Sequence, residues 1–587
     1  MTRRRFLSNS LALAGAAALR INPARAGAAA PSRVRPGMPG WPSDADWAGL
    51  KAQIGGRLAP VTAPKFDTPA MMKLIGNPFF LGSDPGLTQS SGYLDAWRTS
   101  PSAYAVTAES AADVAAAVTF AKTHNLRVVV RSGGHSYLGT SNAPDSLLIW
   151  TRPMSAITVH DAFTPQGSSA APAPAVSVGA GCIWLHVYQK VTTEAGRYVQ
   201  GGGCATVGVP GLTLGGGFGT YSKGYGMAAA NLLEAEIVTA DGQTRVVNHA
   251  QAPDLHWALK GGGGGTFGVV TRLTLATHEL PETVGAVRVA IQAHSDAAFR
   301  RLLAAFVDYY AQHLFNPHWG EQVRATPGNR LEVEMEFQGL SQADAREAWQ
   351  GFIDFANDHK DDYSGQGQFL ALALPARHFW DADFLEKNAP FAITMDKRPG
   401  ASPTDFFWAG NGEEAGAFWN AYTSAWLPAE LLTPKNQAKL VDAWFASCRQ
   451  WGVTFHLNKG LAGAPDWAVA AARDTATNPD VAEAFALAII GDIGRSLYYG
   501  APVDLPDARA RAAKVQAAMK ALRACAPKTG AYFNECDFFQ PDWQRAFWGK
   551  NYPKLLAVKR RYDPDGLFYV HHGVGSEAWS ADGFKRV

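Results

Sequence analysis

A histidine directly follows a glycine pair at the end of an apolar run, in the stretch VVVRSGGHSYLG at residues 128–139. Without a Cβ, Gly133 and Gly134 let main-chain N–H groups approach a ligand closely. Successive N–H groups in such a turn form a concave anion site that suits a pyrophosphate, and Arg131 and Ser132 can add a charge and a hydroxyl. On its own, however, the stretch is better explained as a tight turn that carries a structural histidine.

A second stretch carries more glycine than a turn requires: GGGCATVGVPGLTLGGGFGTYSKGYG, residues 201–226. A dinucleotide-binding G-x-G-x-x-G should follow a strand, open a helix and have an acidic residue about 20 positions later. We expect no helix to begin at residues 215–226, and G-K-[ST], the end of a phosphate loop, is missing. A long glycine-rich path across a flat ligand fits this stretch better than either nucleotide motif.

Local patterns place the first stretch just after a β-α-β unit. Residues 103–108 (AYAVTA) and 127–130 (RVVV) are typical of strands. Between them, apolar residues recur at helical spacing over residues 110–124, and Ser110 is a good N-cap for that helix. The histidine is therefore expected at the end of the second strand of the unit.

The rest of this half of the chain reads as strands joined by loops. Residues 232–248 predict a hairpin that turns at Asp241-Gly242, a strong short-range hairpin signal. Residues 267–279 (FGVVTRLTLATHE) predict a closing strand, and Pro281 is a natural boundary after it.

Beyond that boundary, long strands alternate with amphipathic helices. Residues 330–339 (RLEVEMEFQG) alternate strictly, which predicts a strand with one face packed on a core. Its other face is acidic; it either looks into a site or, more commonly for such faces, is solvated. Residues 341–358 predict an amphipathic helix capped by Ser341. This half is expected to be an antiparallel sheet with helices on one side. The two faces of the strand carry Leu331, Val333, Met335 and Phe337, and Glu332, Glu334 and Glu336.

Composition narrows the possible partners of the 587-residue chain. A formal net charge of +2 argues against nucleic acid as a partner. After the N-terminal leader, no apolar run reaches the ~18 residues that a membrane helix needs. The five cysteines are an odd number, so at least one stays unpaired within the monomer. It is a free thiol or is bonded to something other than cysteine. The eighteen tryptophans fit a large core better than an aromatic-lined sugar pocket.

The first residues have the features of an export signal. Arg3 and Arg4 precede an apolar stretch rich in Ala and Leu, which ends in the A-x-A pattern of residues 24–26. Residues 1–26 are therefore interpreted as a twin-arginine signal, which implies an exported, periplasmic or secreted protein. Residues 27–97, rich in Pro, Gly and Ala over the first forty positions, are expected to form an N-terminal extension that acts as a tail or clasp.

Three separated motifs, in the right order, resemble one family. R-S-G-G-H-S is followed by G-x-x-C-x-x-V-G-V-x-G-x-x-x-G-G-G-x-G and, near the C-terminus, by YFNECD and FWGKNYPKLLAVKRRYDPDGLF. The chain is similar to the berberine-bridge-enzyme-like branch of the vanillyl-alcohol-oxidase superfamily of flavoproteins, over about residues 100–280 and 532–574.

The resemblance implies an α+β fold with a two-part PCMH-type FAD-binding domain. An antiparallel-sheet-plus-helices substrate domain is inserted between its two parts. The FAD-binding domain would occupy residues 98–280 and the substrate domain residues 281–524. Residues 525–587 would return to the FAD-binding domain as the berberine-bridge-like C-terminal segment.

The resemblance also implies how FAD is held. In that family the histidine of the first motif bonds to the flavin 8α-methyl group and the cysteine of the second bonds to flavin C6; here these are His135 and Cys204. This assignment suits the odd cysteine count. The remaining residues expected at the cofactor are Arg131, Ser132, Gly133, Gly134, Ser136, Val207, Gly208, Gly215, Gly216, Gly217, Gly219, Gly268 and Val269. No metal site is expected, because adjacent histidines such as His571 and His572 point oppositely on a strand.

Two departures from the family pattern affect details of the cofactor contacts. The family often has Arg and Asp-Asn where this chain has Lys223 and Ala230-Asn231. The sequence Thr-Phe-Gly at residues 266–268 also stands where Asn-Phe-Gly is frequent.

The C-terminal motif supplies candidates for the catalytic base. Where the family often has a second tyrosine, this chain reads Tyr532-Phe533-Asn534-Glu535. A carboxylate beside a flavin can take an alcohol proton, so Glu535 is a candidate. It could instead hold a neighbour in place while Tyr532 or a residue of the middle region acts as base. On a regular strand Tyr532 and Asn534 face opposite to Glu535, so a bulge or strand end is needed to bring Tyr532 and Glu535 to one pocket.

Together these features predict an FAD-linked oxidase of small molecules. An alcohol, sugar or secondary-metabolite CH–OH or CH–N group would pass a hydride to flavin N5, with O2 as the acceptor that becomes H2O2. A first alternative is a dehydrogenase of the same fold that uses a quinone or protein acceptor. A second is a secreted carbohydrate-binding or carbohydrate-hydrolysing protein, and a third is a flavoprotein that has lost turnover and only binds ligands.

Overall fold

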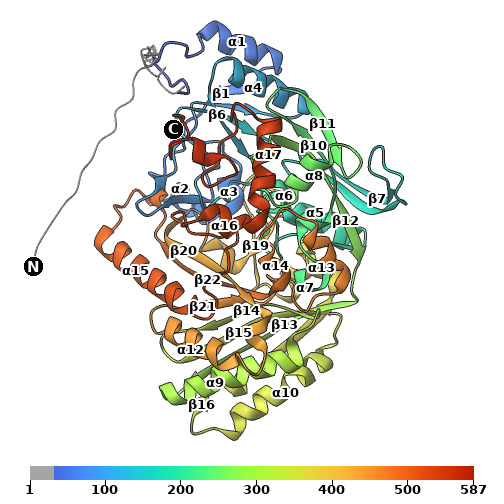
Figure 1. The fold of residues 1–587 in the computed structure, drawn as a ribbon, viewed down its shortest axis with the longest axis vertical. Helices are drawn as coiled ribbons and strands as arrows, with labels where there is room; N and C mark the ends of the chain where they lie inside the picture. Colours follow the sequence, from blue (N-terminus) through green and yellow to red (C-terminus); the bar gives the residue numbers. More distant parts are fainter. Residues whose placement is uncertain (1–31) are drawn as a thin grey trace, which may run out of the picture.

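The computed structural model describes residues 32–587, so the expected signal at residues 1–26 lies outside the described residues. The molecule is elongated, with two sheets and their helices in the upper half of Figure 1 and one large sheet in the lower half. The chain returns to the upper half at its C-terminal end. The histidine motif directly follows a strand of one of the two upper sheets, so it lies in the upper half of the molecule.

The predicted β-α-β unit is present and is closed by local hydrogen bonds. Strands β4 (Tyr104–Thr107) and β5 (Arg127–Arg131) both run parallel to β6 (Ser146–Trp150), which lies between them. Helix α4 (Ala111–Thr123) begins at Ser110, which forms a capping box with Asp113. The sheet order is β1-β4-β6-β5, with β1 (Leu58–Pro60) from the N-terminal extension.

A second sheet packs behind the glycine-rich region. Its path is β11-β10-β12-β8-β7, and β9 also pairs with β12. The predicted hairpin is formed by β10 and β11, and the turn between them contains Gly242 with φ of 78°. The strands are β7 (Ile157–Phe163), β8 (Ala173–Gly179), β9 (Arg197–Val199), β10 (Leu232–Val238), β11 (Thr244–Asn248) and β12 (Val269–Glu279).

The lower half is a ten-stranded sheet in which nearly every neighbouring pair is antiparallel. Pro281 lies in the short link between β12 of the second sheet and β13 of this one. The path is β16-β13-β15-β14-β21-β22-β20-β2-β3, with β17 also on β13, and β2 runs parallel to β20. The strands are β2 (Ser90–Tyr93), β3 (Trp97–Arg98), β13 (Thr283–Ala293), β14 (Trp319–Ala325), β15 (Arg330–Gln338), β16 (Tyr363–Ser364), β17 (Leu370–Pro375), β20 (Ala417–Pro428), β21 (Val453–His456) and β22 (Ala484–Gly494).

Four long helices cover one face of this sheet, as the sequence predicts. The apolar face of β15, from Leu331 to Phe337, packs with these helices in one large core. Burial of the apolar surface of this core stabilises the lower half. The helix predicted at residues 341–358 begins at Ser341, again through a capping box. The helices are α9 (Asp296–Tyr309), α10 (Gln342–Asp358), α12 (Gln437–Cys448) and α15 (Leu505–Leu522). The fold is the predicted α+β arrangement.

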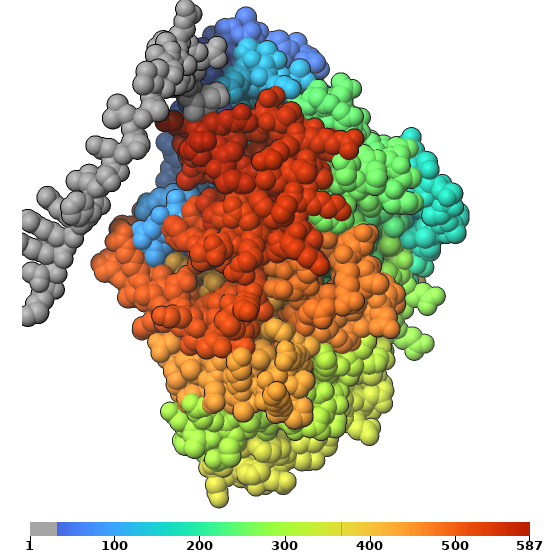
Figure 2. Space-filling view, viewed as in Figure 1, coloured from blue at the N-terminus to red at the C-terminus, as the bar shows by residue number. Residues whose placement is uncertain are grey.

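The two ends of the described chain meet on the upper half. The main-chain N–H of Arg33 donates to Phe584 O at 2.8 Å, and the Arg33 guanidinium donates to Gly566 O at 2.5 Å. Phe568 adds a parallel bridge to Val128 at the edge of β5. Helices α16 (Trp543–Trp548) and α17 (Tyr552–Tyr562) belong to this C-terminal segment, which forms a continuous surface across the upper half in Figure 2. No helix of residues 32–587 is long and apolar enough to cross a membrane.

Candidate active site

One cleft brings together the histidine motif, the second glycine-rich stretch and the C-terminal motif. Its lining comes from the turn after β5, from residues 207–214 and 264–270, and from two pieces of the C-terminal segment. These segments are far apart in the sequence, and each is delivered to the cleft by the end of a strand or by a short loop. Representative lining residues are Ser132, His135, Gly208, Gly268, Tyr532 and Glu535.

The glycine pair makes a close main-chain contact that no larger residue would allow. A Cβ on Gly133 would lie 2.6 Å from Gly208 N, and Gly134 has φ of 82°. The Ser132 hydroxyl is buried and has no hydrogen-bond partner among the described residues. Because a buried hydroxyl normally has a partner, this free group fits an anionic ligand such as the pyrophosphate of FAD.

The side chain of Arg131 is bonded to carbonyl groups of the N-terminal extension. Its guanidinium donates to the carbonyls of Asp84, Pro85 and Leu87 and lies 5.4 Å from the Trp150 ring. Burial lowers its pKa to about 10. Arg131 lines the cleft, so the expectation that it adds charge to a pyrophosphate stays a prediction, with its guanidinium already bonded to the N-terminal extension. Ser136 is likewise engaged, since its hydroxyl accepts from Thr140 Oγ1 at 2.7 Å.

The two expected anchors, His135 and Cys204, approach the same threonine hydroxyl. His135 Nε2 lies 3.1 Å from Thr206 Oγ1, and Cys204 Sγ lies 3.9 Å from that atom. Burial lowers the pKa of His135 to about 4, so its imidazole is neutral at physiological pH. Burial, followed by the charge of Glu414, raises the pKa of the Cys204 thiol to about 11. A neutral imidazole and a polarisable thiol side by side are a donor set suited to bonding a flavin ring.

The remaining glycines mostly shape the cleft from behind. Gly217 donates its N–H to the Tyr532 hydroxyl at 3.0 Å, and a Cβ on Gly219 would lie 2.0 Å from Gly201 O. Gly268, which lines the cleft, has no room for a Cβ because Val238 O would lie 2.5 Å away. The side chain of Val269 is fully buried in the core of the upper half rather than in the cleft, and Val207 and Gly208 line the cleft.

The helix expectation for this stretch needs a small correction. A short helical turn, α7 (Ser222–Tyr225), begins within residues 215–226, and α6 (Val209–Leu214) precedes it. Neither provides the long helix that a dinucleotide fingerprint requires, so the interpretation as a glycine-rich path is unaffected.

The C-terminal motif forms a tight turn, so Tyr532 and Glu535 do not point to opposite sides as they would on a regular strand. Tyr532 and Glu535 are paired as an isolated bridge, and Glu535 N donates to Tyr532 O at 3.0 Å. Both side chains therefore reach the same cleft, together with Asn534. Asn534 Nδ2 donates to the Tyr532 hydroxyl at 3.1 Å and to the carbonyls of Gly211 and Leu212. Asn534 thus ties the turn to the glycine-rich stretch.

Glu535 is held by a lysine that the sequence did not single out. Lys459 Nζ lies 2.6 Å from both carboxylate oxygens of Glu535, and the side chains are 10% and 22% exposed. Lys459 follows β21 in the lower half of the molecule. The ion pair therefore ties the C-terminal motif to the lower half of the molecule.

Further carboxylates interact with this pair: the charges of Glu321 and Glu414 act on Glu535, and Glu336 of β15 interacts in turn with Glu321. Glu336 is half-buried, and burial followed by the charge of Glu321 raises its pKa to about 7. Burial also raises the pKa of Glu321, which accepts from Asn458 and has φ of 61° within β14. Loss of hydration, followed by the charge of Glu535, raises the pKa of Glu414 to about 6. The acidic face is thus solvated at Glu334, whereas Glu336 is half-buried and its Oε1 lies 3.3 Å from Arg288 Nη2.

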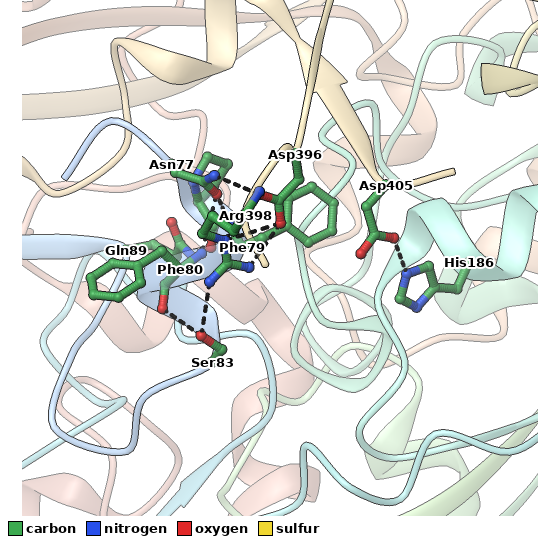
Figure 3. Close-up of polar contacts among 10 residues, drawn as sticks. Asn77, Phe79, Phe80, Ser83, Gln89, His186, Asp396, Arg398 and Asp405 are labelled. Carbon is green, nitrogen blue, oxygen red and sulfur yellow. Dashed lines mark hydrogen bonds and ion pairs between the residues drawn. The ribbon is translucent and has the colours of Figure 1, made fainter. Parts of the chain in front are cut away.

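The segment between β17 and β20 contacts the main chain next to Cys204. It contains the two-stranded sheet β18 (Ile393–Met395) and β19 (Phe406–Trp408), and Trp408 Nε1 donates to Gly203 O at 3.1 Å. In Figure 3, Asp405 of this segment is hydrogen-bonded to His186, with Asp405 Oδ1 2.8 Å from His186 Nε2.

Figure 3 also shows how this segment joins the N-terminal extension. The Asp396 carboxylate accepts hydrogen bonds from Asn77 Nδ2 and from the Arg398 guanidinium, and Arg398 also donates to Ser83 Oγ. The side chain of Asp396 is fully buried, so these bonds replace the water that it would otherwise need. This segment is therefore joined both to the glycine-rich stretch and to the N-terminal extension.

The residues that depart from the family pattern have structural contacts. Lys223 is fully buried, and its ammonium donates to Gly460, Ala462 and Phe485 carbonyls. Asn231 Nδ2 donates to Tyr225 O and Met227 O, and its Oδ1 contacts His278 Nε2 at 2.8 Å. Lys223 thus joins the glycine-rich stretch to the segment that carries Lys459.

The paired histidines also have structural contacts. His571 Nε2 bonds Phe538 O at 2.9 Å, and its ring stacks on Phe538 with centroids 3.8 Å apart. His572 stacks on Trp543. All five cysteines have free thiols. No group of three His, Cys, Asp or Glu side chains within residues 32–587 could hold a metal ion.

Comparison with known families matches two parts of the chain. Residues 102–248 match the family described as FAD binding domain, and residues 531–575 match the family described as berberine and berberine like. The first range contains both glycine-rich stretches, and the second contains the Tyr532–Glu535 turn.

Curated relatives match nearly the whole chain. The VAO-type flavoprotein oxidase VAO615 of Thermothelomyces thermophilus is 30% identical, with 94% of this chain and 95% of the relative covered. The FAD-linked oxidoreductase easE of Arthroderma otae is also 30% identical, covering 94% of this chain and 91% of its own.

Solved structures share the fold. The VAO-type flavoprotein MtVAO615 of Myceliophthora thermophila C1 aligns with a TM-score of 0.76 at 24% identity, covering 95% of this chain and all of the other. The glucooligosaccharide oxidase of Acremonium strictum, described with a 6-S-cysteinyl, 8α-N1-histidyl FAD, aligns with a TM-score of 0.65 at 18% identity, covering 90% and 99%.

Proposed function

The chain belongs to the berberine-bridge-enzyme-like, VAO-type family of FAD-linked oxidoreductases, and from this premise we propose that it is a bicovalent FAD oxidase. Its substrate would be a small molecule with a CH–OH or CH–N group, such as an alcohol, a sugar or a secondary metabolite. The acceptor would be O2. An alcohol would lose two electrons and two protons from its CH–OH group to become a carbonyl compound, and one O2 would take them up to become one H2O2.

The single observation that carries the proposal is the shared cleft of His135 and Glu535. The cleft places an expected flavin anchor and a candidate base on one continuous surface, although 400 positions separate them in the sequence. FAD supplies a two-electron acceptor when it is bound. The protein must then hold the substrate carbon toward that acceptor and remove one proton.

Glu535 is proposed as the base that accepts the substrate proton. It lines the cleft, and its side chain pairs with Lys459, which orients both carboxylate oxygens. A base must lie within hydrogen-bond reach of the proton it removes. Tyr532, the other strong candidate, already uses its oxygen to accept from a main-chain N–H.

Tyr532 and Asn534 are proposed as positioning groups. The Tyr532 hydroxyl accepts from Gly217 N and from Asn534 Nδ2, which leaves it one proton to donate. Burial, followed by the Glu535 charge, raises the pKa of Tyr532 well above its usual range. A phenol that stays protonated can orient a substrate oxygen by donating to it, but it is a poor base.

Covalent attachment of FAD through His135 and Cys204 is supported by their positions. Both side chains approach Thr206, and the second glycine-rich stretch brings Cys204 next to the turn that holds His135. The free Ser132 hydroxyl and the main-chain contact of Gly133 with Gly208 fit a pyrophosphate at the other end of the cofactor. Two covalent bonds would hold the flavin without enclosing it, which leaves room for a bulky substrate.

The twin-arginine interpretation of residues 1–26 leads to a proposal about location. We propose that the protein is exported to the periplasm or secreted after folding. Since this pathway carries folded proteins, often with a cofactor bound, it suits a chain that must acquire FAD first.

The test begins with the flavin. The purified protein is precipitated with acid, and the absorbance spectrum and intact mass of the pellet are measured, for the unmodified chain and for His135→Ala, Cys204→Ala and the double variant. The proposal expects a yellow pellet with one added FAD in the first three and a colourless pellet in the double variant. A colourless pellet from the unmodified chain would contradict covalent attachment.

The second step tests the acceptor. Alcohols, sugars and amines are screened for anaerobic bleaching of the flavin, and each substrate that bleaches it is then assayed for H2O2 in air. One H2O2 per product supports an oxidase. Bleaching that is reversed by a quinone but not by O2 would instead identify a dehydrogenase. Absence of bleaching across the panel would favour a ligand-binding flavoprotein.

A further inference from the structure

The Thr206 hydroxyl lies between the two expected flavin anchors. It is 3.1 Å from His135 Nε2 and 3.9 Å from Cys204 Sγ, and Thr206 is 4% exposed. A hydroxyl has one proton to donate and two lone pairs to accept with. One side chain is therefore hydrogen-bonded to both groups that would bond to the flavin.

The surroundings decide which ring nitrogen of His135 carries the proton. A main-chain hydrogen bond of Thr206 raises the pKa of His135, against the larger effect of burial. Thr206 Oγ1 lies 3.1 Å from Nε2 and can accept a proton from it, so we assign the ring proton to Nε2. Nδ1 then keeps its lone pair for bond formation.

The same hydroxyl can then donate to sulfur. If Thr206 Oγ1 accepts from Nε2–H, its own proton is free for Cys204 Sγ. Burial and then the charge of Glu414 raise the pKa of Cys204, whereas hydrogen bonds from the main chain and then the side chain of Thr206 favour the thiolate and lower it. The chain of donors runs in one direction, from imidazole to hydroxyl to sulfur.

We propose that Thr206 is the shared positioning residue for both flavin attachments, selecting Nδ1 of His135 as one nucleophile and promoting the thiolate of Cys204 as the other. This proposal rests on the proposed bicovalent attachment. It assigns a function to a residue that lies between the motif positions of the second glycine-rich stretch.

Each attachment reaction is balanced in atoms and electrons when dioxygen is the oxidant. A C–H bond of the flavin and the N–H or S–H bond of the side chain break, and one C–N or C–S bond forms. The two protons and two electrons that are released reduce O2 to H2O2. Thr206 gains and loses no proton overall, so its contribution is to orient the ring and stabilise the developing anion.

The experiment measures attachment on each anchor separately. Thr206→Val removes the hydroxyl at nearly constant shape, and Thr206→Ser keeps it. Both are placed in the Cys204→Ala background, where only His135 can bond, and in the His135→Ala background, where only Cys204 can bond. Protein prepared without FAD is mixed with FAD in air, and acid-stable flavin is followed by absorbance and intact mass.

Losing one hydrogen bond of about 0.5–1.5 kcal/mol corresponds to roughly two- to tenfold slower attachment. We expect this slowing in both backgrounds for Thr206→Val, and rates close to the parent for Thr206→Ser. In the His135→Ala background, the pH at which attachment is half-maximal should also move to a higher value for Thr206→Val. Such a pH shift follows from a thiol that ionises less readily, and a merely structural role would not produce it.

Thr213→Val is the matched control. Thr213 is fully buried in the same glycine-rich region, and its hydroxyl has no hydrogen-bond partner within residues 32–587. Its removal should leave both attachment rates unchanged. Circular dichroism and non-covalent FAD binding check that each variant folds, and Thr206→Ala replaces Thr206→Val if the latter does not.

Equal rates for Thr206→Val and Thr206→Ser in both backgrounds would overturn the proposal while leaving bicovalent attachment intact. Loss of attachment at one anchor alone would overturn the shared role. Complete release of flavin from the unmodified protein would overturn the bicovalent proposal and, with it, the function of Thr206.

Discussion

Lys459 Nζ lies 2.6 Å from each carboxylate oxygen of Glu535. The two residues come from different halves of the molecule, since Lys459 follows β21 of the large sheet and Glu535 belongs to the C-terminal segment. The pair therefore fixes the proposed base relative to both the ten-stranded sheet and the cleft.

Replacing the proposed base should stop turnover without removing the flavin. Glu535→Gln keeps the shape of the side chain but cannot accept a proton, so kcat should fall about 10²- to 10⁴-fold. Covalent flavin content should stay at the parent level. The measurement is the rate of anaerobic flavin reduction by a substrate found in the screen.

Glu483→Gln is a suitable control for that variant. Glu483 pairs with Arg473 on the surface, where both side chains are more than 60% exposed, and such pairs contribute little. Its kcat should match the parent. If Glu535→Gln also matches the parent, proton removal must be assigned to another residue.

The Lys459–Glu535 pair should show strong coupling in stability. Removing one partner of a buried ion pair leaves an unpaired charge and costs about 3–5 kcal/mol. Lys459→Met should therefore lower the free energy of unfolding more than the double variant Lys459→Met/Glu535→Gln does. Urea denaturation of the four proteins gives the coupling energy, and strictly additive effects would mean that the pair is not formed in solution.

Tyr532→Phe should destabilise the turn that carries the C-terminal motif. The change removes the acceptor of the buried Gly217 N–H, which should cost about 1–3 kcal/mol. Urea denaturation monitored by circular dichroism measures the loss. Tyr104→Phe in β4, where the ring stacks on Trp47, is a comparison in which less change is expected; an equal loss in both variants would argue against the Gly217 contact.

Glu336 should make stability fall as pH rises toward neutrality. Burial and Glu321 raise its pKa from 4.5 to about 7, so the folded protein binds more protons than the unfolded chain between these values. The free energy of unfolding then decreases as pH increases through this window, by on the order of 1–3 kcal/mol for this group. Glu336→Gln should weaken that decrease.

The control for this pH effect lies on the same strand. Glu334 faces the same side of β15 but is exposed, and its charge makes only a small contribution to the pKa of Glu336, so Glu334→Gln should change the pH dependence much less than Glu336→Gln. Denaturation at pH 5 and pH 8 for the three proteins provides the comparison. Identical slopes for Glu336→Gln and the parent would show that Glu336 ionises normally.

Local chemistry explains which parts of the fold the sequence could predict. The capping boxes at Ser110 and Ser341, the Asp241-Gly242 turn and the alternation of β15 depend on residues a few positions apart, and all are present. The family motifs added the FAD-binding fold and the return of the C-terminal segment to it.

Contacts between distant segments explain what the sequence could not predict. Lys459 and Thr206 have no distinctive spacing of their own; their importance comes from partners brought near by the fold. Arg131 was assigned to the anion site from its place in the motif, and the carbonyl acceptors of its guanidinium lie at Asp84, Pro85 and Leu87, in a region without periodicity. The joint position of Tyr532 and Glu535 depended on a turn that alternation alone does not reveal.

The contact between the two ends of the described chain has a consequence for biosynthesis. Arg33 is bonded to Gly566, which is translated 533 residues later, so at about 5–20 residues per second this contact must wait roughly half a minute to two minutes. Phe568 and the Tyr532–Glu535 turn also arrive only near the end of translation. The cleft is therefore completed after the ribosome has made almost the entire chain, and a ribosome that stalls shortly before the Tyr532 codon would leave a nearly full-length product without a working cleft.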